Sequence, residues 1–95
     1  MKITVEFLGF PMASDVIGKK KLEVDISGNT VKDVIDELIG LYGRKVRGAF
    51  YDENGNFDVI LQTMLNGKTL IPADKHHTVL SEGDTLVFML LLAGG

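Results

Sequence analysis

The chain has no cysteine, no tryptophan and only two prolines among its 95 residues. Without cysteine there is no disulfide framework, no thiolate nucleophile, no zinc ribbon and no iron–sulfur cluster. The longest apolar run, 86–93, is far shorter than the roughly twenty residues that span a bilayer. The formal net charge is only −3, which argues against binding nucleic acid by neutralising its phosphates with a basic face. We therefore expect no membrane partner, no nucleic-acid partner and no bound metal.

Length and composition indicate one packed domain. Hydrophobic residues make up 45% and charged residues 24% of the chain, which is ordinary for a globular domain and unlike a disordered one. A chain of this length supports a single modest core. Charges at Lys2 and Glu6 interrupt the place where the apolar stretch of a signal peptide would begin. We expect a cytoplasmic protein with one domain over residues 1–90 and a flexible tail over 91–95.

Alternation with period two predicts the first two strands. Ile3, Val5 and Phe7 alternate with polar neighbours, and the same pattern returns over 22–26. The segment 9–20 between them is rich in turn-forming residues and too short for a crossover helix. The sequence therefore predicts an antiparallel hairpin closed by a loop.

A helical period follows the second strand. Apolar residues recur three and four positions apart over 31–42. Thr30 is a good N-cap, and Asp33 stands where the acid of a capping box belongs. We expect one amphipathic helix that begins after Thr30 and ends near Gly43.

The second half of the chain predicts three more strands. The segment 52–56 is the strongest turn signal, and a mostly apolar strand follows over 59–65. The Asn-Gly pair at 66–67 favours a tight hairpin turn, with a short return strand over 68–71. A last strand covers 85 to about 90. The fold class is α+β, with a mixed sheet of about five strands and one main helix packed across it.

The last strand is apolar on both sides. Leu86, Phe88 and Leu90 form one set, and Val87, Met89 and Leu91 form the other. One helix covers only one face of a sheet, so the second set needs another partner. Alternation alone does not decide which set faces the helix.

Enzymatic motifs are missing. The sequence has no Gly-x-Ser-x-Gly, no His-Glu-x-x-His and no phosphate loop, and Gly67 is explained by a hairpin turn. His76 and His77 are adjacent, so in an extended segment they point to opposite sides and cannot readily chelate one ion. We interpret them as structural or exposed, with a pH-sensitive contact as the alternative.

The segment 91–95, Leu-Leu-Ala-Gly-Gly, is the most informative part of the chain. Glycine has no Cβ, so Gly94 and Gly95 could enter a narrow channel in almost any backbone conformation. The α-carboxylate of Gly95 becomes an electrophile only after adenylation with ATP, and the adenylate could then be attacked by sulfur to give a thiocarboxylate. The apolar residues Leu91, Leu92 and Ala93 would dock against an activating or receiving enzyme.

The chain resembles, nearly end to end, the sulfur-carrier branch of the ubiquitin-like superfamily (the MoaD/ThiS family), and most closely the small subunit of molybdopterin synthase. The matching segments are 3–10, Gly18, 30–33, 50–56, 65–68, 80–84 and 92–95. Only the last of these is specific for function, because the others mark the fold.

The resemblance implies a β-grasp fold in which the first and last strands pair in parallel. It implies that Gly95 becomes an adenylate and then a thiocarboxylate, with ATP used by an adenylating enzyme and no cofactor bound to the carrier. The expected partners are that ubiquitin-activating-like enzyme and the large subunit of molybdopterin synthase, which would supply the catalytic residues. On this analogy Leu86 and Phe88 face the helix, while Val87, Met89 and Leu91 face the partner.

Two alternatives stay open. Ser14-Asp15 stands where family members often carry Arg-Glu, and Leu90 stands where a proline is frequent. These departures leave room for a carrier in thiamine synthesis or tRNA thiolation, or for a ubiquitin-like modifier joined to target lysines through Gly95. The second alternative is a non-catalytic interaction module in which the Gly-Gly pair is incidental.

Overall fold

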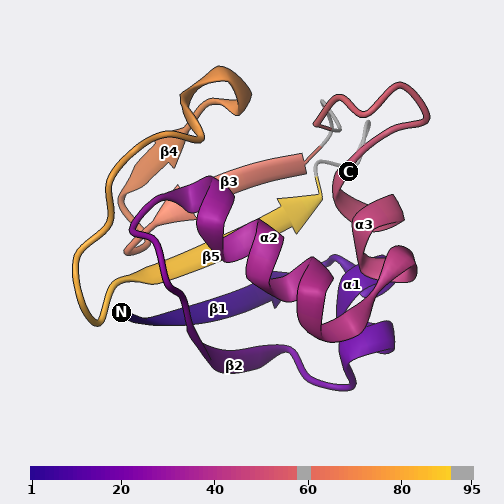
Figure 1. Ribbon diagram of the computed structural model, residues 1–95, viewed down its shortest axis with the longest axis horizontal. Coiled ribbons are helices and arrows are strands. Elements are labelled where there is room, and N and C mark those ends of the chain that lie inside the picture. The colour runs from indigo at the N-terminus through magenta and orange to yellow at the C-terminus, as the bar shows by residue number, and fades with distance from the viewer. Residues whose placement is uncertain (58–60, 91–95) are drawn as a thin grey trace.

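The computed structural model describes residues 1–57 and 61–90 (Figure 1). Within them lie five strands, three α-helices and a short 3-10 turn, here called η1. Their bounds in chain order are β1 (Lys2–Leu8), α1 (Pro11–Ile17), β2 (Lys21–Asp25), α2 (Val31–Tyr42), α3 (Arg44–Phe50), β3 (Leu61–Leu65), β4 (Thr69–Ile71), η1 (Ala73–Lys75) and β5 (Thr85–Leu90).

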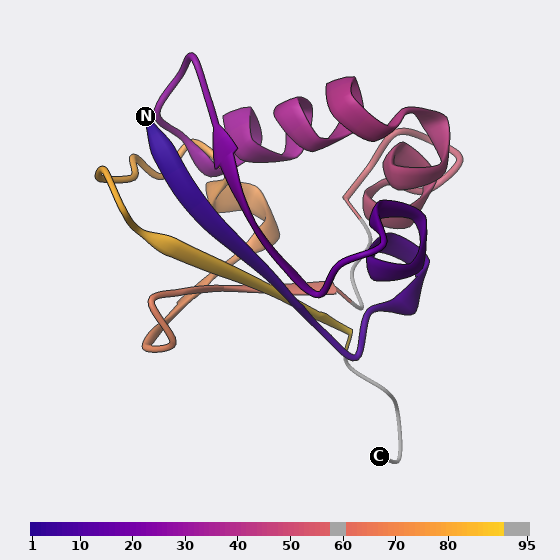
Figure 2. The same ribbon diagram turned by 90° about the horizontal axis from the view of Figure 1, so that it is seen from below.

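The strands form one mixed sheet in the order β2-β1-β5-β3-β4. β1 and β5 pair in parallel, and every other neighbouring pair is antiparallel. All three α-helices lie on one side of the sheet (Figure 2). This is the predicted β-grasp architecture, and the predicted parallel pairing of the first and last strands is confirmed.

The core lies between the sheet and the helices and is built around phenylalanine. Phe7, Phe10, Phe50 and Phe88 are each at most 1% exposed. The ring of Phe50 meets that of Phe88 edge to face, with centroids 4.9 Å apart, and meets that of Phe10 at 5.5 Å. Such pairs add to the burial of apolar area. Phe50 therefore ties α3 to the central strand β5.

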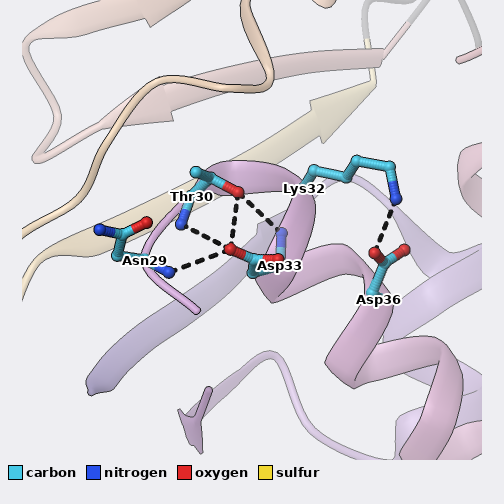
Figure 3. Close-up of polar contacts among 5 residues, drawn as sticks. All are labelled: Asn29, Thr30, Lys32, Asp33 and Asp36. Carbon is cyan, nitrogen blue, oxygen red and sulfur yellow. Dashed lines mark hydrogen bonds and ion pairs between the residues drawn. The ribbon is translucent and has the colours of Figure 1, made fainter. Parts of the chain in front are cut away.

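The predicted start of α2 is confirmed (Figure 3). The Thr30 hydroxyl accepts a hydrogen bond from the Asp33 backbone N–H at 3.2 Å, and the Asp33 carboxylate accepts one from the Thr30 N–H at 3.0 Å. The carboxylate also accepts from the Asn29 N–H at 3.0 Å. The Thr30 hydroxyl also donates a hydrogen bond to the Asp33 carboxylate at 2.9 Å. This bond, followed by those from the Thr30 and Asn29 N–H groups, lowers the pKa of Asp33. The capping box fixes the direction in which the helix leaves the sheet.

The segment expected to be a simple loop contains the helix α1, so that expectation was wrong. Pro11 occupies the first turn, where its missing N–H costs nothing. The helix is held by burial, because Ala13 and Ile17 lie in the core. Gly18 ends it with φ of +81° and donates its N–H to the Ser14 carbonyl at 2.7 Å. Tertiary packing therefore makes a helix from a sequence with few helical signals.

The expectation of one main helix was also incomplete. α2 ends before Gly43 as predicted, with the Gly43 N–H bonded to the Ile39 carbonyl at 2.7 Å. The chain then turns straight into α3 at Arg44. Val46, Ala49 and Phe50 recur at helical spacing and are buried. The short helix is stabilised by this apolar face, since no side chain caps it.

The second half of the sheet agrees with the sequence except at strand ends. β3 begins at Leu61 among the described residues, whereas the strand was expected from 59, and residues 58–60 lie outside them. Asn66 and Gly67 have φ of +54° and +68°, as the expected turn requires. β4 starts at Thr69, one residue later than expected. No helix within 1–57 or 61–90 has the length and apolar content for a membrane crossing.

Candidate functional site: the open face of the sheet and the strand before the glycine tail

β5 lies at the centre of the sheet and exposes different side chains to its two faces. Leu86 and Phe88 are fully buried in the core between sheet and helices. Val87 and Met89 alternate with them and belong to the opposite, open face. Alternation did not decide which set of side chains faces the helices. In the structure Leu86 and Phe88 do, as the resemblance implied.

Neighbouring strands extend the apolar character of the open face. Met89 lies beside Leu8 of β1 in the parallel register, and Val87 lies beside Met64 of β3. Met64 in turn faces Leu70 of β4. We call these five residues, Leu8, Met64, Leu70, Val87 and Met89, the apolar patch.

The accessible part of the apolar patch lies at its margins. Leu8 is 47% and Leu70 is 53% exposed, whereas Val87, on β5 between β1 and β3, is only 8% exposed. Met64 and Met89 are half-buried. Unbranched methionine adapts its shape to a partner surface. The patch therefore leaves apolar side chains partly accessible on the open face of the sheet.

Leu8, Met64 and Leu70 were missed in the sequence analysis. The signal for Leu8 was available, because it continues β1 on the face opposite Ile3, Val5 and Phe7 and breaks the polar pattern there. Met64 and Leu70 could not be placed in the same way. Their contribution depends on the β3–β5 and β3–β4 registers, which the alternation within each strand does not specify.

Polar and charged side chains border the apolar patch. Glu6 lies next to Val87 in the register, and Gln62 lies next to Met89. Farther along the sheet, β2 presents Lys21 and Glu23, both exposed, beside Glu6 and Thr4. An apolar centre within a polar rim is the usual composition of a protein–protein interface.

The remaining predicted site residues, Leu91, Leu92, Ala93, Gly94 and Gly95, lie outside the described residues. They follow β5 directly in the sequence. The last described residue, Leu90, pairs with Leu61 of β3, and its neighbour Met89 pairs with Leu8. The tail segment therefore begins at the end of the sheet where Leu8 and Met89 of the apolar patch meet.

His76 and His77 have different environments. The His76 side chain is 8% exposed and its ring meets Phe57 edge to face, with centroids 4.3 Å apart. His77 is exposed. Burial, with a smaller contribution from the charge of His77, lowers the pKa of His76. The His76 carbonyl accepts the Lys32 N–H at the start of α2 at 3.0 Å. The structure thus gives His76 a packing role.

A surface hollow of about 350 Å³ lies on the helical side of the molecule. Lys32 and Asp36 form an ion pair of 2.7 Å there (Figure 3), and the hydrogen bond to Asp36 raises the pKa of Lys32. Arg47 and Tyr51 contribute to the wall, and burial raises the pKa of Tyr51. The paired charges offset each other, and the wall provides no nucleophile–base pair for catalysis.

Comparison with solved structures identifies the fold. No protein-family model matches the chain. The chain is similar to SAMP1, a small archaeal modifier protein of Haloferax volcanii, with 20% identity over 100% of both chains and a TM-score of 0.80. It is similar to a chain of the Amycolatopsis orientalis BexX/CysO complex, with 20% identity over 98% of this chain and 99% of that one and a TM-score of 0.71.

A third similar structure is a putative molybdopterin converting factor, subunit 1, of Pyrococcus furiosus, with 18% identity over 97% of this chain and 99% of that one and a TM-score of 0.64. These three structures share the β-grasp fold with this chain. The resemblance found in the sequence is therefore confirmed at the level of the fold. At these identities the likeness does not extend to a pathway.

Proposed function

We propose that this protein is a sulfur carrier that acts through the carboxylate of Gly95 and docks on its partner enzymes through the apolar patch. The observation that carries the proposal is the position of β5. This central strand contributes Val87 and Met89 to the open face, and in the sequence it is followed directly by the Leu-Leu-Ala-Gly-Gly segment. One partner surface could therefore bind the patch and receive the tail together.

The chemistry of the tail has three steps. In the first, a Gly95 carboxylate oxygen attacks the α-phosphate of ATP, so that an acyl adenylate forms and pyrophosphate leaves. In the second, a sulfur nucleophile attacks the activated carbonyl and AMP leaves. When the nucleophile is a persulfide, this attack gives an acyl disulfide. In the third step a thiol reduces its S–S bond, so that the thiocarboxylate is released and the thiol is oxidised to a disulfide. The adenylating partner supplies the catalytic groups, and this chain supplies a slender substrate.

Within this role we propose the small subunit of molybdopterin synthase as the pathway assignment. The similarity to a putative molybdopterin converting factor subunit supports it. The large subunit of that synthase would then accept the sulfur from Gly95. The match to a chain of the BexX/CysO complex fits a protein that works with a partner, but it favours no single pathway.

Protein modification is the second candidate. The similarity to a small archaeal modifier protein favours it. Its activation step is the same, and the difference lies in the nucleophile, because a lysine amine of a target displaces the activated group and an amide forms. Conjugates of higher mass in cells, abolished by removal of Gly94 and Gly95, would identify this candidate.

The test is the intact mass of the protein after incubation with an adenylating enzyme, ATP and a sulfur source. We expect the mass change of one oxygen replaced by one sulfur, localised by fragmentation to Gly95. The same spectrum checks that the polypeptide ends at that residue. An unchanged mass with several adenylating enzymes, or full function after deletion of Gly94 and Gly95, would instead indicate a plain interaction module.

Substitution in the tail sharpens this test. Gly94→Val adds a branched side chain to a segment that has to enter a narrow channel, so we expect activation to stop while the melting temperature is unchanged. Ala93→Gly is the matched control, since it adds no bulk and should be activated. A Gly94→Val protein that is fully thiocarboxylated would contradict the role of the slender tip.

A further inference from the structure

The outer edge of β2 carries a pattern that the proposed function does not use. β2 forms one border of the sheet, along the lower margin in Figure 1. The Phe7 N–H bonds to the Lys20 carbonyl, and the Ile26 N–H bonds to the Met1 carbonyl, both at 2.8 Å. Because antiparallel partners alternate in their bonding, the even-numbered residues of β2 direct their N–H and C=O groups towards β1.

The odd-numbered residues of β2 therefore direct their backbone groups away from the sheet. These are Lys21, Glu23 and Asp25, and among the described residues none of them takes part in a backbone hydrogen bond outside the ladder. Thr4, which faces Glu23 across the ladder, confirms the phase, because its N–H points the other way and bonds to the Asp84 carbonyl at 2.9 Å. The edge thus offers unpaired donors and acceptors in a row.

Charge along this edge is segregated. The same three residues of β2 have charged side chains on the open face. The charge is positive at the start of the strand, at Lys21, and negative towards its end, at Glu23 and Asp25. Lys19 continues the positive half just before the strand. All four side chains are exposed. An edge of a single charge sign would repel its own copy, whereas this one is complementary to itself when the two copies run antiparallel.

We propose that two copies of this chain associate through antiparallel pairing of their β2 edges, with the two-fold axis at Leu22. In this register the N–H and C=O groups of Lys21 bond to those of Glu23 in the second copy, and the reverse pair forms by symmetry. Each pair also places an ammonium beside a carboxylate. Asp25 is brought towards Lys19 of the second copy, so no like charges are opposed.

The register also suits the other side chains. Leu22 meets its own equivalent as a non-hydrogen-bonded pair, in which the Cα atoms approach most closely. Leu22 is half-buried against the core and belongs to the edge strand β2. The contact is isologous and therefore closes at two copies.

The pairing leaves the proposed carrier site free. A two-fold axis perpendicular to the sheet joins two five-stranded sheets into one and keeps the helices of both copies on the same side. The apolar patches lie on the other side, centred on β5 and β3 rather than on β2. The opposite border of the sheet, β4, has only three residues and is followed by Pro72, which has no N–H to donate. β2 is thus the better edge for pairing.

The decisive experiment is a charge swap followed by sedimentation equilibrium over a range of protein concentrations. Wild type is expected to populate a species of two chains, more at low salt than at high salt. In Glu23→Lys, the new lysine of each copy faces Lys21 of the other copy. This repulsion is expected to weaken association about tenfold. The double variant Lys21→Glu with Glu23→Lys exchanges the signs, restores complementarity and should regain association. Glu53→Lys, in the exposed 52–56 loop, is the control with the same charge change as the single variant.

Amide hydrogen exchange gives an independent readout on the same samples. The Leu22 and Val24 N–H groups bond to β1, so they are expected to be protected at every concentration. The Lys21 and Glu23 N–H groups should become protected only as concentration rises, and not in Glu23→Lys. A wild type that stays monomeric at low salt, or one whose association is equally strong in Glu23→Lys, would overturn the proposal whether or not Gly95 carries sulfur.

Discussion

The two faces of β5 differ in what fixes their side chains. On the helix-covered face, Leu86 and Phe88 are fully buried, and Phe88 contacts aromatic rings from β1 and α3. On the open face, Met89 is half-buried and its sheet neighbour Leu8 is 47% exposed. The covered face is buried by contacts within the chain, whereas the open face leaves apolar area accessible. The same strand therefore supports stability on one side and is available for recognition on the other.

The largest effect is expected from truncation on the covered face. Phe88→Ala removes a ring that packs on Phe50 at 4.9 Å and on Phe7 at 6.1 Å, so we expect the free energy of unfolding to fall by about 3–5 kcal/mol. Urea denaturation measures this loss. A loss below about 1 kcal/mol would mean that the two faces do not differ as described.

A charge on the open face is expected to act on binding instead. Met89→Asp places a carboxylate in the apolar patch and should weaken docking to the adenylating enzyme by about 2 kcal/mol, while the urea midpoint changes little. Calorimetric titration gives the affinity. Thr4→Asp lies on the same face outside the patch and is the control. If Met89→Asp unfolds the protein while affinity per folded molecule is unchanged, Met89 is part of the core and not of the docking surface.

The covered face has a weak point at Thr63. Its side chain is 1% exposed and lies beside Phe88 in the register, and within residues 1–57 and 61–90 its hydroxyl has no hydrogen-bond partner. Thr63→Val keeps the shape and removes the unpaired hydroxyl, so we expect a gain of about 1 kcal/mol in the free energy of unfolding. Thr69→Val, at an exposed position on β4, is the control. A loss of stability in Thr63→Val would show that the hydroxyl is bonded in solution.

The smallest effect is expected from the buried side chain of His76, whose Nε2 has no hydrogen-bond partner in the part of the chain that the structure describes. Burial lowers its pKa in the folded protein from the ordinary value of 6.5. The unfolded chain therefore takes up the proton first, and stability is lost as the pH falls below about 6.5 through the lowered pKa. His76→Gln should flatten the loss of stability between about pH 7.5 and about pH 5, measured by urea midpoints. His77→Gln should keep the wild-type slope, and equal slopes in all three proteins would contradict the assignment.

Much of the architecture could be predicted from local signals. The capping box of Thr30 and Asp33, the turn at Asn66 and Gly67, and the alternation in β1 each determine structure over a few residues. The helices α1 and α3 could not be found in this way. Each has seven residues and no side-chain cap. Ile17 of α1 is buried and α1 contacts α3, while Phe50 of α3 packs on Phe88 of β5. Their helical state is a consequence of the completed core.

The candidate site was predictable in part for a related reason. Val87 and Met89 were chosen because β5 is apolar on both sides, and the chemistry of Gly95 follows from residue types alone. Leu8, Met64 and Leu70 join them only through the pairing of strands far apart in sequence. Face assignment on β5 needed the same information, because a period of two is symmetric between the faces.

The order of the sheet also has a consequence for biosynthesis. β5 comes after the other four strands in the sequence and lies between β1 and β3, so this central strand leaves the ribosome after the strands on both sides of it. Until Thr85–Leu90 has emerged, β1 and β3 lack the strand that pairs with both of them. During that time the apolar side chains of β1 remain exposed. Nascent chains that stop short of this strand would therefore expose an incomplete sheet to chaperones and proteases. Such chains would also lack Val87 and Met89, so under the function proposed above they could not dock through the apolar patch.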